Sequence, residues 1–245
     1  MQKQFSLLPK LAVLSVMAAC AAPAMAQSAG SNVVNLGWFH LAPQDSSEGI
    51  TGIGGLVNGA SKPNAHSSID NADTLGLAFT HFFTDNIAVT LDAGVAPTFH
   101  LTGQGDLASF GQIGSAKQWS PALVAKYFFG SANDKFRPFV GAGVTYVWYT
   151  DAKLSPAFQR YAGSATTNLV PGTASASLSS STAPVFSLGA TYQLDDRWSL
   201  GFSLSYIPLK TDATVTGTSV LGNSVYKTKL TINPVVSFLS VGYKF

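Results

Sequence analysis

The sequence is short of charged residues. Asp, Glu, Lys and Arg make up only 11% of its 245 residues, less than half of the share of about a quarter that is usual in a soluble domain. Basic and acidic residues nearly balance, 14 against 12, so the net charge of +2 gives no electrostatic basis for binding nucleic acid. Because 46% of the residues are apolar, the composition also excludes a disordered chain of low hydrophobicity and high charge.

Cysteine and long apolar runs are also lacking. Cys20 is the only cysteine, which excludes a disulfide framework and a zinc site built on cysteines. The sequence has no uninterrupted apolar stretch of about 18 residues, the length that a membrane-spanning helix needs. A chain that is apolar, poor in charge and without such a run must therefore place its apolar residues in alternation with small or polar ones.

The first 26 residues are predicted to be a secretory signal peptide. Two lysines give a positive start, Leu11–Ala19 is a short apolar core, and Ala24–Ala26 is a small-x-small cleavage site. The apolar core is too short to cross a bilayer. Cleavage leaves a mature chain that begins at Gln27 and has no cysteine. Lipid attachment at Cys20 is the alternative, but the Ala24–Ala26 site is better placed.

Alternation of period two runs through the rest of the chain. Successive side chains of a strand face opposite sides, so a half-buried strand alternates in character. The segment Trp198–Tyr206 is the clearest example, with a large apolar residue at every even position and Gly or Ser at every odd one. No window of comparable length shows a convincing apolar stripe of helical period. The eight predicted strands lie near 33–41, 74–83, 87–96, 119–129, 140–148, 186–193, 198–206 and 225–245.

The connections between these strands alternate strictly between short and long. Short turns lie at 84–86, 130–135 and 194–197, and longer loops lie near 42–72, 101–117, 151–183 and 211–224. An even number of strands with short periplasmic turns and longer outer loops is typical of an outer-membrane barrel. The sequence therefore predicts an all-β fold, a single eight-stranded antiparallel up-and-down transmembrane β-barrel over residues 27–245. Its long extracellular loops, rich in Gly, Ser and Thr, are expected to be mobile surface rather than a second domain.

The apolar face of this barrel is predicted to point outward, toward lipid. A closed barrel pairs all of its backbone polar groups, as a bilayer requires, and aromatic girdles are expected at both membrane interfaces. A soluble barrel with its apolar face inward is the alternative, but it needs more exterior charge than these strands provide. Beside the short turns we count Phe82, Phe83, Tyr127, Phe128, Phe129, Phe136, Tyr192, Trp198, Tyr243 and Phe245, and at the opposite ends Trp38, Phe39, Phe99, Trp119, Trp148, Tyr149 and Tyr206.

Several motifs resemble the outer membrane protein W (OmpW) family. The most specific is Arg-Pro-Phe-Val-Gly-Ala-Gly within Phe136–Val144, and the others are Lys126–Gly130, Trp198–Leu200, Tyr206–Pro208, Ile232–Pro234 and Val241–Phe245. The resemblance spans about 33–245 and is weakest in the loops. It implies an eight-stranded barrel that passes small hydrophobic molecules across the bacterial outer membrane, with a narrow apolar funnel and a lateral opening toward the bilayer. Some members are associated with the uptake of alkanes or aromatic hydrocarbons.

The lumen is predicted to be narrow and lined by small residues. Eight strands leave room for side chains or for one small ligand, so a water-filled pore is not expected. Asp92, Lys126 and Arg137 are the charged inward residues, and we predict that they plug the periplasmic end, so that a solute from outside leaves sideways into lipid. Alternatively, these charges only satisfy one another, as buried charges must. The small lining residues are predicted to include Gly76, Thr90, Gly94, Gly141, Gly143, Thr145, Ser187, Gly189 and Ser203.

The sequence gives little support for catalysis. No zinc-binding histidine pair, phosphate loop or Gly-x-Ser-x-Gly motif is present. His66-Ser67-Ser68 has the residues of a lipid-modifying barrel enzyme in which a histidine activates a serine, but the surrounding loop is rich in serine by composition. We expect no enzyme, cofactor or metal site. The expected partners are outer-membrane lipids, small hydrophobic solutes and, through the C-terminal Phe245, the barrel-assembly machinery, with the protein a monomer. A structural or receptor role of the long loops stays open.

Overall fold

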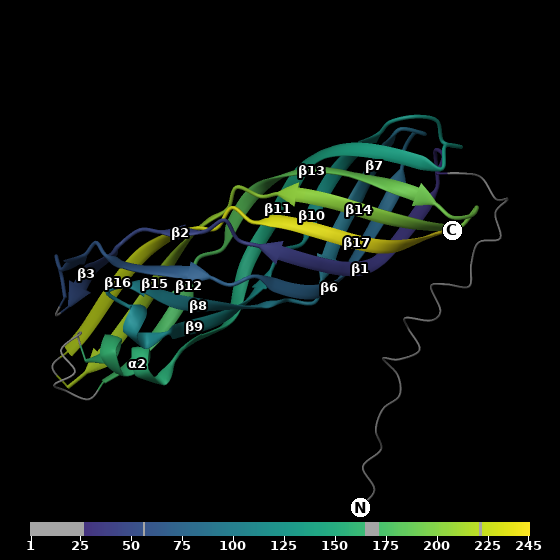
Figure 1. Ribbon diagram of the computed structural model, residues 1–245. Coiled ribbons are helices and arrows are strands. Elements are labelled where there is room, and N and C mark those ends of the chain that lie inside the picture. The colour runs from purple at the N-terminus through teal and green to yellow at the C-terminus, as the bar shows by residue number, and fades with distance from the viewer. Residues whose placement is uncertain (1–26, 56, 165–171, 221) are drawn as a thin grey trace, which may run out of the picture.

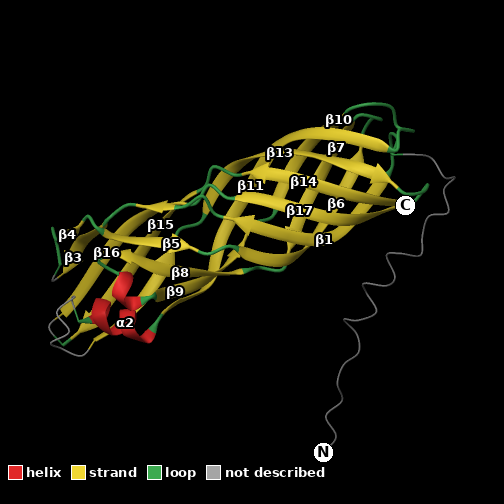
Figure 2. Cartoon of the chain, in the orientation of Figure 1, coloured by secondary structure: helices red, strands yellow, loops and turns green. Residues whose placement is uncertain are grey.

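The computed structural model describes residues 27–55, 57–164, 172–220 and 222–245, so the predicted signal peptide and Cys20 lie outside the described residues. The molecule is elongated, with a barrel of long strands in one half and a second group of strands, called here the extension, in the other (Figure 1). Strands make up nearly all of both halves (Figure 2). The C-terminus lies at the far end of the barrel, beside the short turns.

Eight antiparallel strands close the barrel. Each strand pairs with its neighbours in sequence, and the pairings β10–β11 and β1–β17 complete the ring. This confirms the predicted eight-stranded up-and-down barrel. The strands are β1 (Asn32–Ala42), β6 (Ala72–Phe82), β7 (Ile87–Gly94), β10 (Ala122–Phe128), β11 (Phe136–Leu154), β13 (Ser181–Gln193), β14 (Trp198–Tyr206) and β17 (Val235–Lys244).

The large apolar side chains of the barrel point outward. On β14, Trp198 and Phe202 are 45% and 49% exposed, whereas Ser199 between them is 2% exposed. Leu36 on β1 and Leu188 on β13 are likewise exposed. This confirms a lipid-facing apolar belt, since an exterior of this kind suits acyl chains rather than water.

The short turns are held by local hydrogen bonds. In the turn between β13 and β14, the Asp195 carboxylate accepts hydrogen bonds of 2.8 Å from the backbone N–H groups of both Arg197 and Trp198. The N–H of Leu194 also donates to the carbonyl of Trp198, at 2.9 Å. An aspartate that binds its own turn in this way favours a tight reversal of the chain.

The long connections are built largely of strands, where the sequence analysis expected irregular loops. Ser, Thr and Ala carry little apolar contrast, so their alternation is hard to read from the sequence, although Thr is favoured in strands. The predicted last strand is divided in two at Ile232–Pro234, and the predicted loop near 211–224 forms most of a hairpin. The strands of the extension are β2 (Ser46–Ser47), β3 (Ile50–Gly55), β4 (Ser61–Lys62), β5 (Ala65–Ile69), β8 (Thr98–Gly105), β9 (Gln112–Trp119), β12 (Gly172–Leu178), β15 (Lys210–Ser219) and β16 (Gly222–Thr231).

A short helix, α2 (Pro156–Gly163), packs on the extension against β12 and β15 and is drawn red in Figure 2. Pro156 suits its first turn, and the hydroxyl of Ser155 accepts a hydrogen bond from the N–H of Phe158. Phe158 and Ala162 are buried in the apolar interior of the extension. Among the described residues, no helix is long and apolar enough to cross a membrane.

Candidate functional site

Arg137 lies inside the barrel at its short-turn end. Its side chain is buried, and its guanidinium donates hydrogen bonds to the backbone carbonyls of Gln27, at 2.9 Å, and Asp85. The same group lies 5.3 Å from the ring centroid of Phe128 and 5.9 Å from that of Phe82. Carbonyl oxygens and aromatic faces together stabilise this buried cation.

An aromatic layer covers Arg137 on the lumen side. The rings of Phe82 and Phe128, and those of Phe128 and Phe139, have centroids 5.0 Å apart, and Lys126 Nζ lies 4.9 Å from the centroid of Phe139. The assignment of five aromatic residues to the outer girdles was wrong: Phe82, Phe128 and Phe99 are buried, and Phe39 and Tyr149 line internal cavities. Strict alternation would have found Phe82 and Phe128, since each continues the inward row of its strand.

The three predicted lumen charges do not form one cluster in contact. Asp92 pairs with Ala122 in the β7–β10 register, which puts Lys126 on the same face but four residues nearer the short turns. Among the described residues, ion pairs within 4.0 Å are His40–Asp73 and Lys117–Asp151, neither of them in the lumen plug. Arg137 and Lys126 therefore belong to the aromatic layer, whereas Asp92 lines the cavity above it.

Two glycines of the lumen make room for aromatic rings. A Cβ atom on Gly76 would lie 2.0 Å from a ring carbon of Phe39, and one on Gly189 would lie 2.7 Å from Cζ of Phe139. Phe39 in turn stacks on Phe238, with centroids 4.0 Å apart. The prediction of a lumen lined mainly by small residues thus missed the rings that occupy the space above them.

Hydroxyl groups on the inward face are engaged with one another or with the backbone. Thr90 bonds to Thr80 at 2.9 Å, Ser187 to Ser205 at 3.2 Å, and Thr145 donates to the carbonyl of Pro121 at 2.9 Å. The other predicted lining residues, Gly94, Gly141, Gly143 and Ser203, have the same inward register on their strands.

A cavity of about 320 Å³ occupies the upper lumen, above the aromatic layer. Its inner lining includes Phe39, Asp92 and Val236. It is also lined by Val95 and Trp119, whose side chains are 64% and 38% exposed on the outer surface. Val95 follows the last residue of β7 and Trp119 is the last residue of β9, so the cavity extends to the edge of the barrel wall at these strand ends.

The opening lies where β7 and β10 lose their pairing. Their ladder ends at Asp92–Ala122, and pairing between β8 and β9 starts only at Thr98–Lys117. Pro97 and Pro121 lie at the two edges of this gap, and proline has no N–H to donate across it. The family resemblance implied a lateral opening but did not give its position, although two X-Pro pairs at facing strand ends, Ala96-Pro97 and Ser120-Pro121, were a signal for it.

His66 lies in the extension and is bonded away from its neighbouring serines. Its Nδ1 donates to the carbonyl of Ser47 at 2.9 Å, and the backbone N–H of Ser67 donates to the hydroxyl of Ser47. The hydroxyl of Ser68 accepts from the amide of Gln104 at 3.1 Å. These bonds hold β2 against β5. The partner of His66 Nδ1 is a backbone carbonyl and not a serine hydroxyl.

The closed barrel, its apolar outer belt and its short-turn architecture define an integral β-barrel protein of the bacterial outer membrane. A model of the OmpW family matches residues 28–245, and the chain belongs to this family.

Named relatives and a solved structure are similar to this chain over most of its length. Outer membrane protein W of Vibrio cholerae is 30% identical over 236 residues, which cover 96% of this chain and 97% of the relative. Outer membrane protein AlkL of Ectopseudomonas oleovorans is 31% identical over 77% of this chain and 73% of its own. The crystal structure of OprG from Pseudomonas aeruginosa superposes with a TM-score of 0.78 at 27% identity, covering 90% of this chain and 98% of that chain.

Proposed function

We propose that this protein is a channel for the passive uptake of small hydrophobic molecules, which leave the lumen sideways through the gap between β7 and β10. The observation that carries this proposal is the lining of the lumen cavity, which includes the outward residues Val95 and Trp119 as well as inward ones. A solute in this cavity therefore has a short route into the lipid that surrounds the barrel.

The size and lining of the cavity suit an apolar solute. Its volume of about 320 Å³ lies at the lower end of the range for small-molecule sites, about 300–1,000 Å³. Its apolar lining includes Phe39, Leu41, Val147 and Val185, and Asp92 is the charged residue in the lining. Transfer of apolar surface from water into such a site is favourable by about 25 cal/mol per Å².

The closed end of the barrel favours a sideways exit. Below the cavity, Phe82, Phe128 and Phe139 fill the lumen, and Arg137 is fixed to the backbone beneath them. A solute that travels along the barrel axis meets this packed layer, whereas the gap requires no rearrangement of it. The OmpW resemblance points to the same class of solute and to the same mode of release.

Uptake into vesicles tests the transport itself. The protein would be reconstituted into asymmetric vesicles with lipopolysaccharide in the outer leaflet, and entry of labelled toluene would be compared with that of a polyol of similar size. We expect toluene to enter faster than in protein-free vesicles, while the polyol does not. Equal rates for the two solutes, or no increase with protein, would contradict the proposal.

Obstructing the gap tests the route. Ala96→Trp and Ser120→Trp each place an indole at one edge of the opening, and we expect toluene entry to fall close to the protein-free rate. Ala125→Trp is the matched control, because Ala125 is exposed on the lipid-facing side of β10, below the gap. Comparison of gel mobility with and without boiling checks that each variant folds. Normal uptake by both folded gap variants would place the exit elsewhere.

A further inference from the structure

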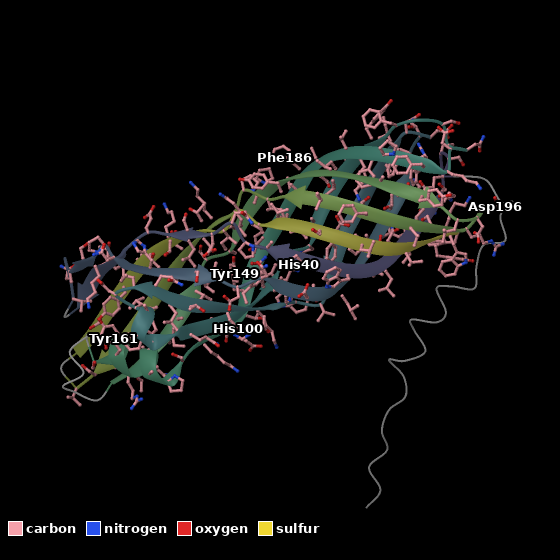
Figure 3. The ribbon with its side chains drawn as sticks, in the orientation of Figure 1. His40, His100, Tyr149, Tyr161, Phe186 and Asp196 are labelled. Atoms are coloured by element: carbon pink, nitrogen blue, oxygen red, sulfur yellow. The ribbon has the colours of Figure 1, made fainter. Side chains whose placement is uncertain are left out.

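Two smaller cavities continue the lumen cavity into the extension. One, of about 20 Å³, lies at the junction of barrel and extension, and the other, of about 80 Å³, lies within the extension. Leu101, Ala116, Leu178 and Leu230 line both of these. Their common lining indicates one apolar path, with its narrowest point at the junction, where Figure 3 shows Tyr149.

Gln118 joins this path to the lumen. Of the described residues, it is the one that lines both the junction cavity and the lumen cavity. It lies near the end of β9, where Ala116 and Gln118 face inward and Lys117 and Trp119 face outward. Its backbone N–H donates to the carbonyl of Pro97 at 3.1 Å and so forms the upper boundary of the wall gap. Any solute that moves from the junction to the gap passes this residue.

The side chain of Gln118 is largely buried and lines both cavities. The residue is only 4% exposed, and no hydrogen bond of its side-chain amide occurs within the described part of the chain. Its neighbours at the junction include Ile69, Phe99 and Ile232. An amide that lines an apolar cavity without a protein partner is free to bond to a ligand there, and such a hydrogen bond favours a solute that can form it over one that cannot.

Tyr149 reinforces the polar character of this point. It pairs directly with Gln118 in the β9–β11 register, so both side chains lie at the same level of the path. Both line the junction cavity, together with Thr211, whose hydroxyl donates to the carbonyl of Ser179 at 2.6 Å. The narrowest part of an otherwise apolar path therefore holds hydrogen-bonding side chains from β9, β11 and β15.

We infer that Gln118 determines specificity, and that the preferred solutes are amphiphiles with an apolar body and one hydrogen-bonding end group, such as medium-chain alcohols, rather than bare hydrocarbons. This inference rests on the proposed function, because it assigns a solute class to the same path. An alcohol both donates and accepts, so it satisfies the amide while its chain remains in contact with Leu101 and Phe99. A hydrocarbon leaves the amide unpaired at the point where the path is narrowest.

The test compares two solutes of equal chain length in three proteins. Entry of labelled octan-1-ol and octane is measured in the vesicles described above for the wild type, Gln118→Leu and Gln112→Leu, with the protein-free rate subtracted. Loss of one hydrogen bond is expected to lower the ratio of octanol to octane entry in Gln118→Leu by about two- to tenfold. Gln112→Leu is the matched control, since Gln112 is exposed on the same strand, and it should keep the wild-type ratio.

The outcomes separate this inference from the proposed function. If the wild type carries neither solute faster than protein-free vesicles, the channel function itself fails. If it carries both and the ratio is unchanged in Gln118→Leu, the role of Gln118 is refuted while the channel stands. Gln118→Met, which keeps an unbranched side chain of similar length, provides a second variant if the leucine variant does not fold, and the same fall in the ratio is expected for it.

Discussion

The barrel and the extension are built from the same chain but turn their apolar side chains in opposite directions. In the barrel, Leu188 and Leu200 face outward and Ser187 and Ser199 face inward. In the extension, Leu230 is buried with other apolar residues, and outer positions such as Thr218 are polar. The two halves therefore match two environments. The barrel exposes its apolar side chains to lipid, and the extension buries its apolar side chains away from water.

Strand β11 passes through both halves and shows where the change occurs. Val140, Val144 and Tyr146 face outward, at 49–55% exposure, whereas Leu154, beyond the register shift between Thr150 and Lys153, packs into the interior of the extension. The indoles of Trp119 and Trp148 stack near this transition, with centroids 6.0 Å apart. Tryptophan is enriched at the membrane–water interface, so this pair marks the level at which the surroundings change from lipid to water.

The largest difference in stability is expected between two variants, one with an arginine on the barrel and one with an arginine on the extension. Leu188→Arg puts a cation on the lipid-facing belt and should destabilise the protein by about 2–4 kcal/mol, the cost of an arginine near the bilayer midplane. Thr218→Arg puts the same side chain on the outer face of the extension, where water solvates it, and should change stability by less than about 0.5 kcal/mol. Urea unfolding in lipid vesicles measures both. Similar costs for the two variants would show that the halves do not differ in their surroundings.

The same contrast explains which parts of the fold the sequence predicted. The barrel strands alternate between large apolar residues and Gly or Ser, as in Trp198–Tyr206, and this difference in size is easy to read. Strands β12 and β15 alternate mainly among Ser, Thr, Ala and Gly. With so little contrast in size or hydrophobicity between the two faces, their pattern resembled that of a flexible loop.

The site was predicted less completely than the fold. Alternation alone predicts that Asp92, Lys126 and Arg137 point into the lumen. The distance between Asp92 and Lys126 along the barrel depends on the register between β7 and β10, which the structure gives and the sequence does not. The burial of Phe82 and Phe128 could have been predicted from the alternation in their strands. Gln118 was not, because its importance depends on two cavities that are formed by residues from five or more segments distant in sequence.

A smaller effect is expected inside the barrel, from Asp92. Asp92→Ala removes the charged residue of the cavity lining, which shares its face of the lumen with Lys126 without an ion pair. We expect a loss of about 0.5–3 kcal/mol in the free energy of unfolding, together with faster toluene entry. Asp73→Ala is the control, since the Asp73 carboxylate makes an exposed hydrogen bond of 2.8 Å with His40 Nδ1, and exposed contacts of this kind contribute about 0–1 kcal/mol. Unchanged stability and unchanged entry in the Asp92 variant would refute a charged plug.

The smallest effect concerns the short-turn end, where Asp195 is fully exposed to water. Hydrogen bonds from the N–H groups of Arg197 and Trp198 lower the pKa of the Asp195 carboxyl from its ordinary value of 3.8. Because the folded state holds the proton less tightly than the unfolded state, the resulting stabilisation is complete above the unfolded pKa. It is lost as the pH falls through the folded pKa. Asp195→Asn keeps a side-chain oxygen in the turn but does not titrate, so its stability difference from the wild type should be present at about pH 6 and shrink toward about pH 3. Urea unfolding across this range measures the difference in stability. A difference that stays constant with pH would show that the charge of Asp195 does not stabilise the turn.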